Sequence, residues 1–573
     1  MSERDAAVCR AQNVIDSTWR RTSDGFFERV VDGRPVEGFP DLSERQAQRT
    51  AEWARAALAE VAAVDLEELP HEPALTLKVA AFQLSIEAQA GERYWLAQVY
   101  GGFPSLFPVT PYGGGGLLRY VWQAFTKFAF SRPGDAGRYL ALIEDCAHVL
   151  DQMRHKLEQQ ASRGIRIPQP ALPGARAFVV GQTETARRVL AVDPSRCAVL
   201  HNRNDFIERA SRRIDERVMP AFARLLETIG VDYERRAPES VGLAQYEGGT
   251  GLYESLVAEH LSLRMAIETV HRLGVERLAE LDGEMARIRS GLGYLERDAF
   301  HRHLLVHPAW TARTAEEVQA RYDNAIRRIE PHLDSLFHDQ PTARYRAARL
   351  DPQLEAGMTY GYYHRPMAGH PDGVYYFNGG NVSERTLTTA ASLIFHELIP
   401  GHHLHIAGQM ENPLLHPLRR HASFNAFNEG WAEYAATLAG EVGLYADPYE
   451  RYGRLLMDAF LTCRLVVDTG MNALGWSLER ARQYMRDHTA MSETEIRSET
   501  LRYSTDIPAQ SLAYKVGEIK FHELRSRARA ALGGRFDLRD FHDAVVGGGS
   551  MPLDVLEWHV EHWLAAQLPR RRG

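Results

Sequence analysis

Cysteine is scarce in this sequence of 573 residues. No two of the four cysteines form a C-x-x-C pair, and they are scattered as Cys9, Cys146, Cys197 and Cys463. This pattern excludes a disulfide-rich secreted scaffold and is typical of proteins in a reducing compartment. None of the four lies near the histidine-rich segment around residue 400, so we assign them no role in metal binding.

Long apolar runs and an excess of positive charge are also missing. No stretch of about 18 apolar residues occurs, so we expect no membrane-spanning helix. The N-terminus lacks a basic start followed by an apolar run, so we expect no signal peptide and predict a cytoplasmic location. The formal net charge of −8 argues against a nucleic-acid-binding surface. The expected partner is therefore a small molecule or a peptide. A homodimer is compatible with the sequence, which does not fix the oligomeric state.

Helical patterns fill most of the sequence. Ser43, followed three residues later by Gln46, is a capping box ahead of an amphipathic run rich in Ala, Glu and Arg. The segment from Gly101 to Gly116 is rich in Pro and Gly and predicts a loop. Residues 373–379 predict a short strand between turn residues. We therefore expect a mainly α fold with a small β element.

The composition changes near residue 340, where Tyr, Gly, His and Pro become frequent. We predict a helical N-terminal lobe over residues 1–340 and a catalytic, zinc-binding lobe over residues 341–573. The two lobes are expected to form one cleft, with the β element next to the metal site.

The segment His396-Glu397-Leu398-Ile399-Pro400-Gly401-His402 says most about function. Histidine and carboxylate are the ligands of catalytic zinc, and a Glu directly after the first His can deprotonate a water on the metal. In the common H-E-x-x-H pattern one helical turn puts both imidazoles on one face. Here the second His is six residues after the first. On a regular helix six residues turn about 600°, which takes the second ring off the first one's face.

Pro400 and Gly401 offer a solution to this spacing. Pro400 has no N–H, and its ring clashes with the carbonyl group four residues back. Gly401 can adopt backbone angles that are closed to other residues. We predict that together they bulge the helix and return His402 to a ligand position. His403 is the alternative ligand, and His405 is expected either just behind the ligands or facing solvent.

A second segment, Asn428-Glu429-Gly430-Trp431-Ala432-Glu433-Tyr434, supplies the third ligand. Glu429 and Glu433 are one helical turn apart and share a face. One can bind the metal while the other accepts the free N–H of a ligating histidine. The string resembles the Asn-Glu-Gly-Phe-Ala-x-Tyr string of aminopeptidase N-type gluzincins, in which the Glu binds zinc, although its distance from the first His is longer here. We therefore predict a Zn²⁺ site made of His396, His402 and Glu429.

These strings resemble the bacterial family known as domain of unknown function 885, whose pattern is H-E-x-x-P-G-H followed by E-G-W-A-x-Y. The similarity covers about residues 130 to 560. Further matches, the first of them loose, are Gly242–His260 with P-x-G-x-x-x-Y, Arg464–Gly470 with R-L-V-x-D-T-G, Arg502–Gly517 with R-Y-x-x-x-P-G-Q-x-x-x-Y-x-x-G, and Phe536–Leu553 with the family's ending. The resemblance implies a two-lobed, gluzincin-like metallopeptidase fold. Two positions depart from the pattern: Asn472 stands where the family often has His, and Ala509 where it usually has Gly.

From these motifs we predict a zinc-dependent hydrolase that cleaves a peptide or amide bond, with Glu397 as the general base. Tyr514 is the predicted donor to the oxyanion, because its string matches the family's and gluzincins often use a Tyr in this way; a buried structural Tyr is the alternative. Arg502 is predicted to bind a substrate carboxylate, with a structural salt bridge as the alternative.

Three more residues are predicted to bind substrate. Tyr376 and Asn378 lie in or beside the predicted strand, which would pair with an extended peptide if it were an exposed edge, or else pack as a core strand. Asn472 would alter the chemistry or the substrate if the family's His assists the transition state. Asp468 is expected to orient Arg464 or a zinc ligand.

Two other functions stay open at the level of sequence. The metal could serve as a Lewis acid for a lyase or another small-molecule reaction. Asn472 in place of the family's His is the reason to consider this alternative. The chain could also be a non-catalytic protein that retains the metal ligands, or a surface His cluster that picks up stray metal. The complete set of His396, Glu397, His402 and Glu429 argues against the last two.

Overall fold

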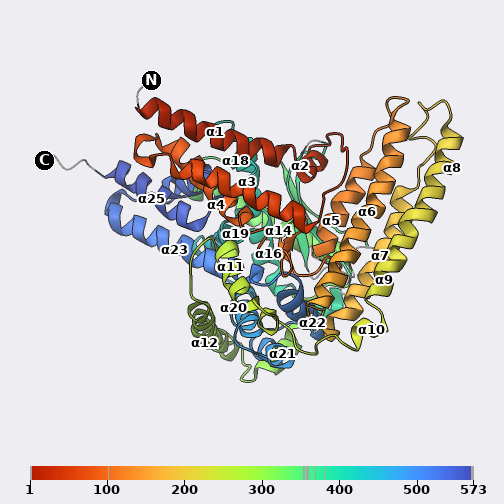
Figure 1. The fold of residues 1–573 in the computed structure, drawn as a ribbon. Coiled ribbons are helices and arrows are strands. Elements are labelled where there is room, and N and C mark those ends of the chain that lie inside the picture. The colour runs from red at the N-terminus through yellow and green to blue at the C-terminus, as the bar shows by residue number, and fades with distance from the viewer. Residues whose placement is uncertain are drawn as a thin grey trace.

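The computed structural model describes residues 3–568 except residues 101, 112, 353–354, 356–359, 368 and 381. Helices dominate it, as the sequence predicts, and the described strands form one two-stranded and one three-stranded sheet. No helix in these described ranges is long and apolar enough to cross a membrane. Figure 1 shows a broad helical body from which a group of long helices projects on one side.

The first helices lie along the top of the molecule in Figure 1. They are α1 (Glu3–Ser23), α2 (Phe26–Val31), α3 (Glu44–Ala62) and α4 (His71–Glu87). The predicted capping box of α3 is confirmed in part. The Ser43 hydroxyl accepts a hydrogen bond from the Gln46 N–H at 3.2 Å, but the Ser43 N–H donates to Asp41 and not to the Gln46 side chain.

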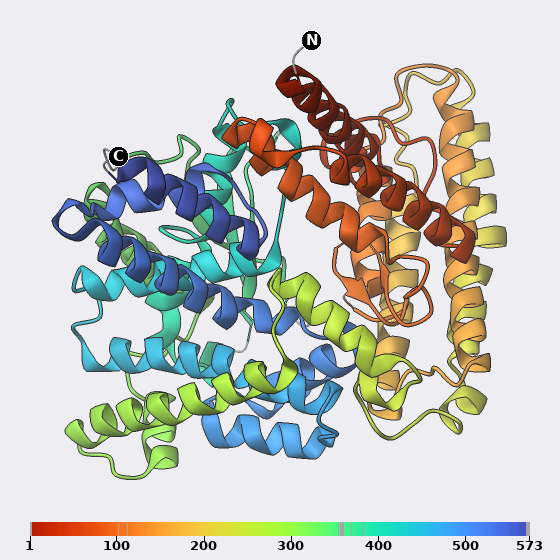
Figure 2. The same ribbon diagram turned by 60° about the vertical axis from the view of Figure 1, so that its left-hand side comes forward.

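Long helices form the projecting arm, which the turned view of Figure 2 separates from the body. The arm and its base contain α5 (Gly113–Thr126), α6 (Asp135–Ser162), α7 (Leu172–Leu190), α8 (Arg203–Arg213), α9 (Met219–Thr228) and α10 (Val231–Glu234). A two-stranded hairpin of β1 (Gln98–Val99) and β2 (Pro104–Ser105) precedes them.

The predicted loop from Gly101 to Gly116 is wrong at its end, because residues 113–116 begin α5. A Cβ atom on Gly114 would lie 1.9 Å from the carbonyl oxygen of Pro108, so only glycine permits this close approach. The burial of Leu117 and Leu118 directly after it favours the helix over a solvated loop.

The three-stranded sheet has the order β3-β5-β4, with β3 at Tyr345–Arg349, β4 at Gly361–His364 and β5 at Gly373–Phe377. β5 pairs in parallel with β3 and antiparallel with β4. The predicted strand is therefore confirmed, but it is the central strand. Its backbone is paired on both sides, so the predicted edge pairing of Tyr376 with a peptide is wrong and the core-strand alternative holds.

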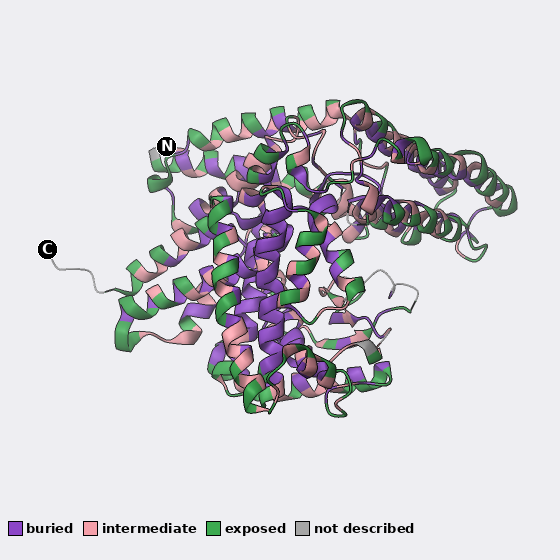
Figure 3. Cartoon of the chain, turned by 90° about the horizontal axis from the view of Figure 1, so that it is seen from below, coloured by how far each residue is buried: buried purple, intermediate pink, exposed green. Residues whose placement is uncertain are grey.

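The remaining helices make up the body. They are α11 (Gly249–Leu261), α12 (Ile267–Gly291), α13 (Arg297–Leu304), α14 (Ala315–Ile329), α15 (Leu333–Leu336), α16 (Ala390–Glu397), α17 (His402–Glu411), α18 (Pro417–Arg420), α19 (Asn425–Glu441), α20 (Pro448–Asn472), α21 (Leu478–His488), α22 (Glu493–Leu501), α23 (Ala513–Leu532), α24 (Leu538–Gly547) and α25 (Leu553–Gln567). Figure 3 shows that the helices at the centre are buried along most of their length. In α20 every residue from Tyr452 to Asn472 is buried.

Two large apolar cores divide the molecule. One takes most of its residues from the stretch between residues 30 and 270, and the other most of its residues from the stretch between residues 278 and 560. Helices α12 and α14, which precede residue 340, belong to the second core and pack against α20 and α16. The apolar packing therefore continues across the predicted lobe boundary near residue 340.

Candidate metal centre

The segment between His396 and His402 breaks the helix instead of bulging it. α16 ends at Glu397 and α17 begins at His402. Leu398 has φ −109° and ψ −98°, outside the helical region, and Gly401 follows with φ −79° and ψ −125°. A Cβ atom on Gly401 would lie 1.8 Å from the carbonyl oxygen of His396, so no other residue fits there. The chain thus returns His402 toward His396 through a tight connection.

Glu429 on α19 completes a group of three possible metal ligands. Its Oε2 lies 3.5 Å from His396 Nε2 and 3.3 Å from His402 Nε2. One ligand atom from each residue lies within 4.8 Å of the other two. A tetrahedral zinc ion with bonds of about 2.0–2.1 Å places its ligand atoms about 3.3–3.4 Å apart. The donor set and the two distances from Glu429 are therefore compatible with zinc, and three protein ligands would leave a tetrahedral ion one position for water or substrate.

Trp431 fixes the connection to α19. It is fully buried, and its indole N–H donates a hydrogen bond to the carbonyl oxygen of Pro400 at 3.1 Å. Gly430 beside it faces Gly517 of α23 so closely that a Cβ atom would lie 2.4 Å from the Gly517 Cα. The glycines of the E-G-W and Y-x-x-G strings thus allow two helices to pack tightly behind the metal centre.

Glu433 contacts His396 through the ring nitrogen that does not face Glu429. Its Oε1 lies 2.8 Å from His396 Nδ1, and its Oε2 accepts a hydrogen bond from Arg454 at 2.8 Å. Arg454 also donates to the hydroxyl of Ser392 on α16. A carboxylate on the free nitrogen of a ligating imidazole fixes the ring's tautomer and orientation.

Replacing Glu433 with Gln should weaken zinc binding by roughly 10- to 100-fold, because the support for His396 loses its charge. Competition with a chromophoric zinc chelator measures this. Glu441→Gln on the same helix is the matched control, since Glu441 pairs with Arg525 at 2.6 Å and touches no metal ligand. Equal zinc affinity in both variants would remove Glu433 from the support of the site.

The neighbouring carboxylates favour a positive charge among the three candidate ligands. Burial acts to lower the pKa of His396, but hydrogen bonds to Glu429 and Glu433 outweigh it and raise the pKa to about 10. Burial opposes ionisation of Glu429, yet both histidines hold its pKa well below the usual range. The site is therefore built to hold a cation, which protons on the imidazoles or a metal ion can supply.

Glu397 lies at the end of α16 beside the three ligands. Burial raises the pKa of its carboxyl, while the charges of His396 and His402 oppose the rise. Within the described residues Glu397 makes no hydrogen bond, so its carboxylate is not committed to a structural partner. Tyr514 stands on the other side, with its ring stacked at 6.1 Å from the ring of His396. Burial and the charge of Glu429 raise the pKa of Tyr514 to about 12, which keeps its hydroxyl protonated.

The two neighbouring histidines, His403 and His405, lie outside the group of three candidate ligands. Both ring nitrogens of His403 are engaged, at 2.9 Å each, with the Tyr363 hydroxyl and the Ala343 carbonyl oxygen. The alternative of His403 as a ligand is therefore wrong. His405 is only 2% exposed, so it does not face solvent either. Its ring lies 5.9 Å from that of His402.

Two of the residues predicted to bind substrate, Arg502 and Asn378, make contacts within the protein. The Arg502 guanidinium lies 3.5 Å from Glu499 and donates to Gln510, which is the predicted structural alternative. Asn378 is 8% exposed, and its amide donates to the carbonyl oxygen of Glu355. Tyr376 is partly exposed on β5. Roles of these three in substrate binding stay predictions.

Asn472 is a buried structural residue, so its predicted contact with substrate is wrong. It is 0% exposed, and its amide group donates to Asp468 and to the carbonyl oxygen of Tyr503, while its oxygen accepts from the Leu243 N–H. These bonds join three chain segments that are distant in sequence. Both amide N–H groups are thus used internally, and the side chain is buried away from solvent, so it is not available to a ligand.

Asp468 belongs to the same structural cluster and orients neither Arg464 nor a zinc ligand. It accepts hydrogen bonds from Tyr253, Ser511 and the Ala509 N–H. Burial raises its pKa to about 6 against these bonds. Ala509 has φ +67°, in the left-handed region where glycine is preferred, which gives a physical reason for the Gly of the family pattern.

Arg454 is the functional residue that the motifs missed. Its helix also carries Asp458, which pairs with Lys515 at 2.5 Å and with Arg277 at 3.0 Å. Two charged residues four apart within the apolar stretch of α20 were the available signal. Such a pair inside a buried helix indicates an internal ion network, because isolated buried charges are too costly.

Comparisons with known proteins identify the family. The sequence matches the family model described as bacterial protein of unknown function (DUF885) over residues 23–560, and no curated protein matches it. The fold is similar to a candidate lipoprotein from Colwellia psychrerythraea, with TM-score 0.84, 22% identity, and coverage of 99% of this chain and 100% of that chain. It is also similar to a candidate lipoprotein of unknown function from Shewanella oneidensis, with TM-score 0.68, 17% identity, and coverage of 96% and 98%. At these identities the likeness concerns the fold alone. Because the family match spans most of its length, the chain belongs to the bacterial DUF885 family.

Proposed function

We propose that this protein is a zinc-dependent hydrolase that cleaves a peptide or amide bond. The observation that carries the proposal is the convergence of His396, His402 and Glu429 with ligand spacings of 3.3 and 3.5 Å, beside an uncommitted Glu397. A zinc ion held by these residues lowers the pKa of water and polarises a carbonyl group. Two imidazole nitrogens with one carboxylate make a His₂Glu donor set, which is used by catalytic zinc sites and favours zinc over magnesium or calcium.

Glu397 acts as the general base in this proposal. Its carboxylate takes a proton from the attacking water and later gives one to the leaving amine. The carboxyl group suits both steps, because burial raises its pKa toward the working range while nearby imidazoles keep it ionisable. In this proposal Tyr514 donates a hydrogen bond to the developing oxyanion. Two observations support this role: its raised pKa keeps the hydroxyl protonated, and its ring is stacked at 6.1 Å from the ring of His396.

The guanidinium group of Arg464 lies over the ring of Tyr514. Its guanidinium carbon lies 4.8 Å from the centre of the Tyr514 ring, and it is held by Tyr503 at 2.7 Å and Glu499 at 3.1 Å. A buried cation over the ring orients the phenol and favours a donor role. The gluzincin-like relationship of the fold is part of the same proposal and rests on the arrangement of Glu397 and the three ligands.

Digestion of a peptide library by the full-length protein tests the proposal. We expect cleavage after loading with zinc, loss of cleavage after chelation, and recovery when zinc is restored. Absence of cleavage with the metal bound would contradict it. The lyase alternative was suggested mainly by Asn472. That argument no longer applies, because Asn472 is a buried structural residue and not part of the site.

The compartment also stays a prediction. Two similar structures are described as candidate lipoproteins, and a lipoprotein would be anchored at a membrane surface. The sequence pattern led us to predict a cytoplasmic location. Fractionation of cells that express the native gene, followed by detection of the protein in each fraction, distinguishes the two.

A further inference from the structure

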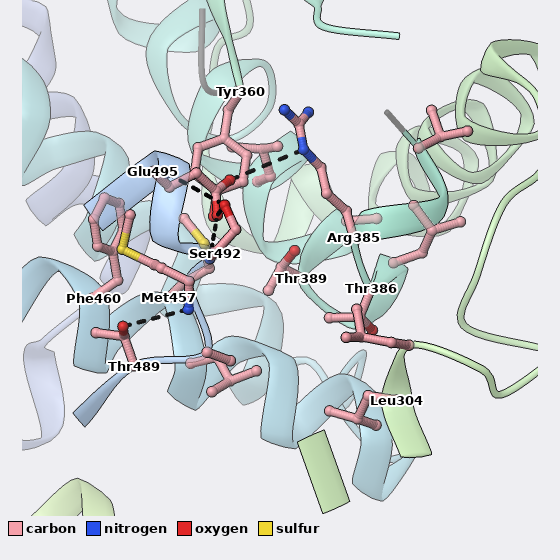
Figure 4. Close-up of a pocket in the computed structure, with 18 of the residues that line it drawn as sticks. Leu304, Tyr360, Arg385, Thr386, Thr389, Met457, Phe460, Thr489, Ser492 and Glu495 are labelled. Atoms are coloured by element: carbon pink, nitrogen blue, oxygen red, sulfur yellow. Dashed lines mark hydrogen bonds and ion pairs between the residues drawn. The ribbon is translucent and has the colours of Figure 1, made fainter. Parts of the chain in front are cut away.

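A cavity of about 210 Å³ lies at the N-terminal part of α16, the helix that ends at Glu397 (Figure 4). Its walls come from α13, α14, α16 and α20 and from the segments that precede α16 and α22. Apolar side chains make up much of the lining, among them Leu304, Leu393, Leu456, Met457 and Phe460. None of the three proposed metal ligands lines it, so it is a separate space and not the metal site itself.

Helix α16 joins the cavity to the catalytic base. Ala390 and Leu393 line the cavity, and Glu397 follows at the next position on the same helical face. The spacing of three and then four residues places all three side chains in one row along the helix. One face of α16 therefore runs from the cavity wall to Glu397.

Helix α20 makes the same connection on the opposite wall. Met457 and Phe460 line the cavity, and Arg464 lies one turn further on. The Arg464 guanidinium carbon is 4.2 Å from the Phe460 ring centre and 4.8 Å from that of Tyr514. Tyr514 in turn stacks on His396 at 6.1 Å. Two independent helices thus lead from the cavity to the reacting groups.

The lining also indicates what the cavity accepts. Among the described lining residues, Arg385 and Glu495 form an ion pair at 4.0 Å, and their charges neutralise each other on one wall (Figure 4). Neither therefore requires a charged ligand. A cavity of about 150 Å³ lined by apolar side chains is large enough for benzene, so this one has room for an aromatic ring or a branched aliphatic chain.

We infer that this cavity is the subsite for the substrate side chain next to the bond that is cleaved, and that it selects a large apolar or aromatic residue. The inference rests on the proposed peptide or amide hydrolysis and adds a substrate class to it: peptides with Phe, Leu or a similar residue beside the scissile bond. The hydroxyls of Thr386, Thr389 and Ser492 at the wall are compatible with the rim of such a subsite.

Filling the cavity tests the inference. Thr389 lines it, makes no capping hydrogen bond, and lies outside the groups that bind metal or carry protons, so Thr389→Phe places a ring in the space. Against peptides that differ only in Phe, Leu or Ala beside the cleaved bond, we expect kcat/KM for the Phe and Leu peptides to fall roughly 10- to 200-fold. The rate for the Ala peptide and the zinc content should stay unchanged.

Two further variants make the test independent of how Thr389→Phe folds. Met457→Ala enlarges the cavity and should shift the preference toward Trp over Leu. Thr185→Phe is the matched control, because Thr185 is a partly exposed residue of α7 that does not line the cavity. Calorimetry with N-acetyl-phenylalaninamide on the chelator-treated full-length protein gives a second readout, and Thr389→Phe should weaken this binding at least tenfold.

The outcomes separate the inference from the proposed function. Hydrolysis whose side-chain preference is the same in wild type, Thr389→Phe and Met457→Ala overturns the inference and leaves the hydrolase proposal intact. No hydrolysis by the zinc-loaded wild type overturns both. The subsite is supported if Thr389→Phe loses activity toward the Phe and Leu peptides and Met457→Ala shifts the preference toward Trp.

Discussion

Replacing Glu397 with Gln should lower kcat roughly 10²- to 10⁴-fold while the protein keeps its zinc. Glutamine has nearly the same shape as glutamate but cannot take a proton from water. Glu397 is not among the three residues that approach one another with ligand spacing, so its substitution leaves the metal ligands in place. Measurement of zinc content and of peptide turnover on the same preparation checks both halves of the prediction.

A matched control is available on the neighbouring helix. Glu411 ends α17, is exposed, accepts hydrogen bonds from Thr342 and Ala343, and is not among the three candidate ligands. Glu411→Gln should leave both turnover and zinc unchanged. Unchanged turnover in Glu397→Gln would rule out the base role, and joint loss of zinc and turnover would show that Glu397 serves the metal instead.

Local sequence predicted what depends on neighbouring residues. The His-Glu pair, the break at Pro400 and Gly401, and the shared face of Glu429 and Glu433 all follow from short-range rules, and the structure brings these residues together. The form of the break was not predictable in the same way. Whether a Pro-Gly step bulges a helix or divides it depends on the packing that receives the second half, here α19 with Trp431 on the Pro400 carbonyl.

Residues whose environment comes from distant segments were misjudged. Asn472 looked like a site residue because the family often has His there, but its partners belong to residues 243 and 503. The sequence left open whether the strand at residues 373–377 is an edge or a core strand, because nothing in its own residues reveals that residues 345–349 pair with it in parallel. Long-range pairing of this kind has no local signal, whereas caps and helix breaks do.

Glu429→Gln should remove tight zinc binding altogether. The carboxylate is the only negatively charged member of the three ligands, and its Oε2 faces both imidazoles at 3.3 and 3.5 Å. The loss of affinity should exceed the roughly 10- to 100-fold expected of Glu433→Gln, which acts only through His396. Zinc at about 100 times its Kd should stabilise the wild type against unfolding by about 2.7 kcal/mol, and this gain should vanish in the variant. Denaturant unfolding with and without zinc measures it.

Three Glu→Gln changes on the single helix α19 then form a graded series. Glu429 faces the ligand nitrogens, Glu433 supports one imidazole from behind, and Glu441 pairs with Arg525 away from the site. Because the substitution is chemically the same at each position, differences in zinc affinity report the position of the carboxylate and not a general effect on the helix. A Glu429→Gln variant that binds zinc as tightly as the wild type would exchange the roles of Glu429 and Glu433, and the third ligand would then have to come from the carboxylate that now contacts Arg454.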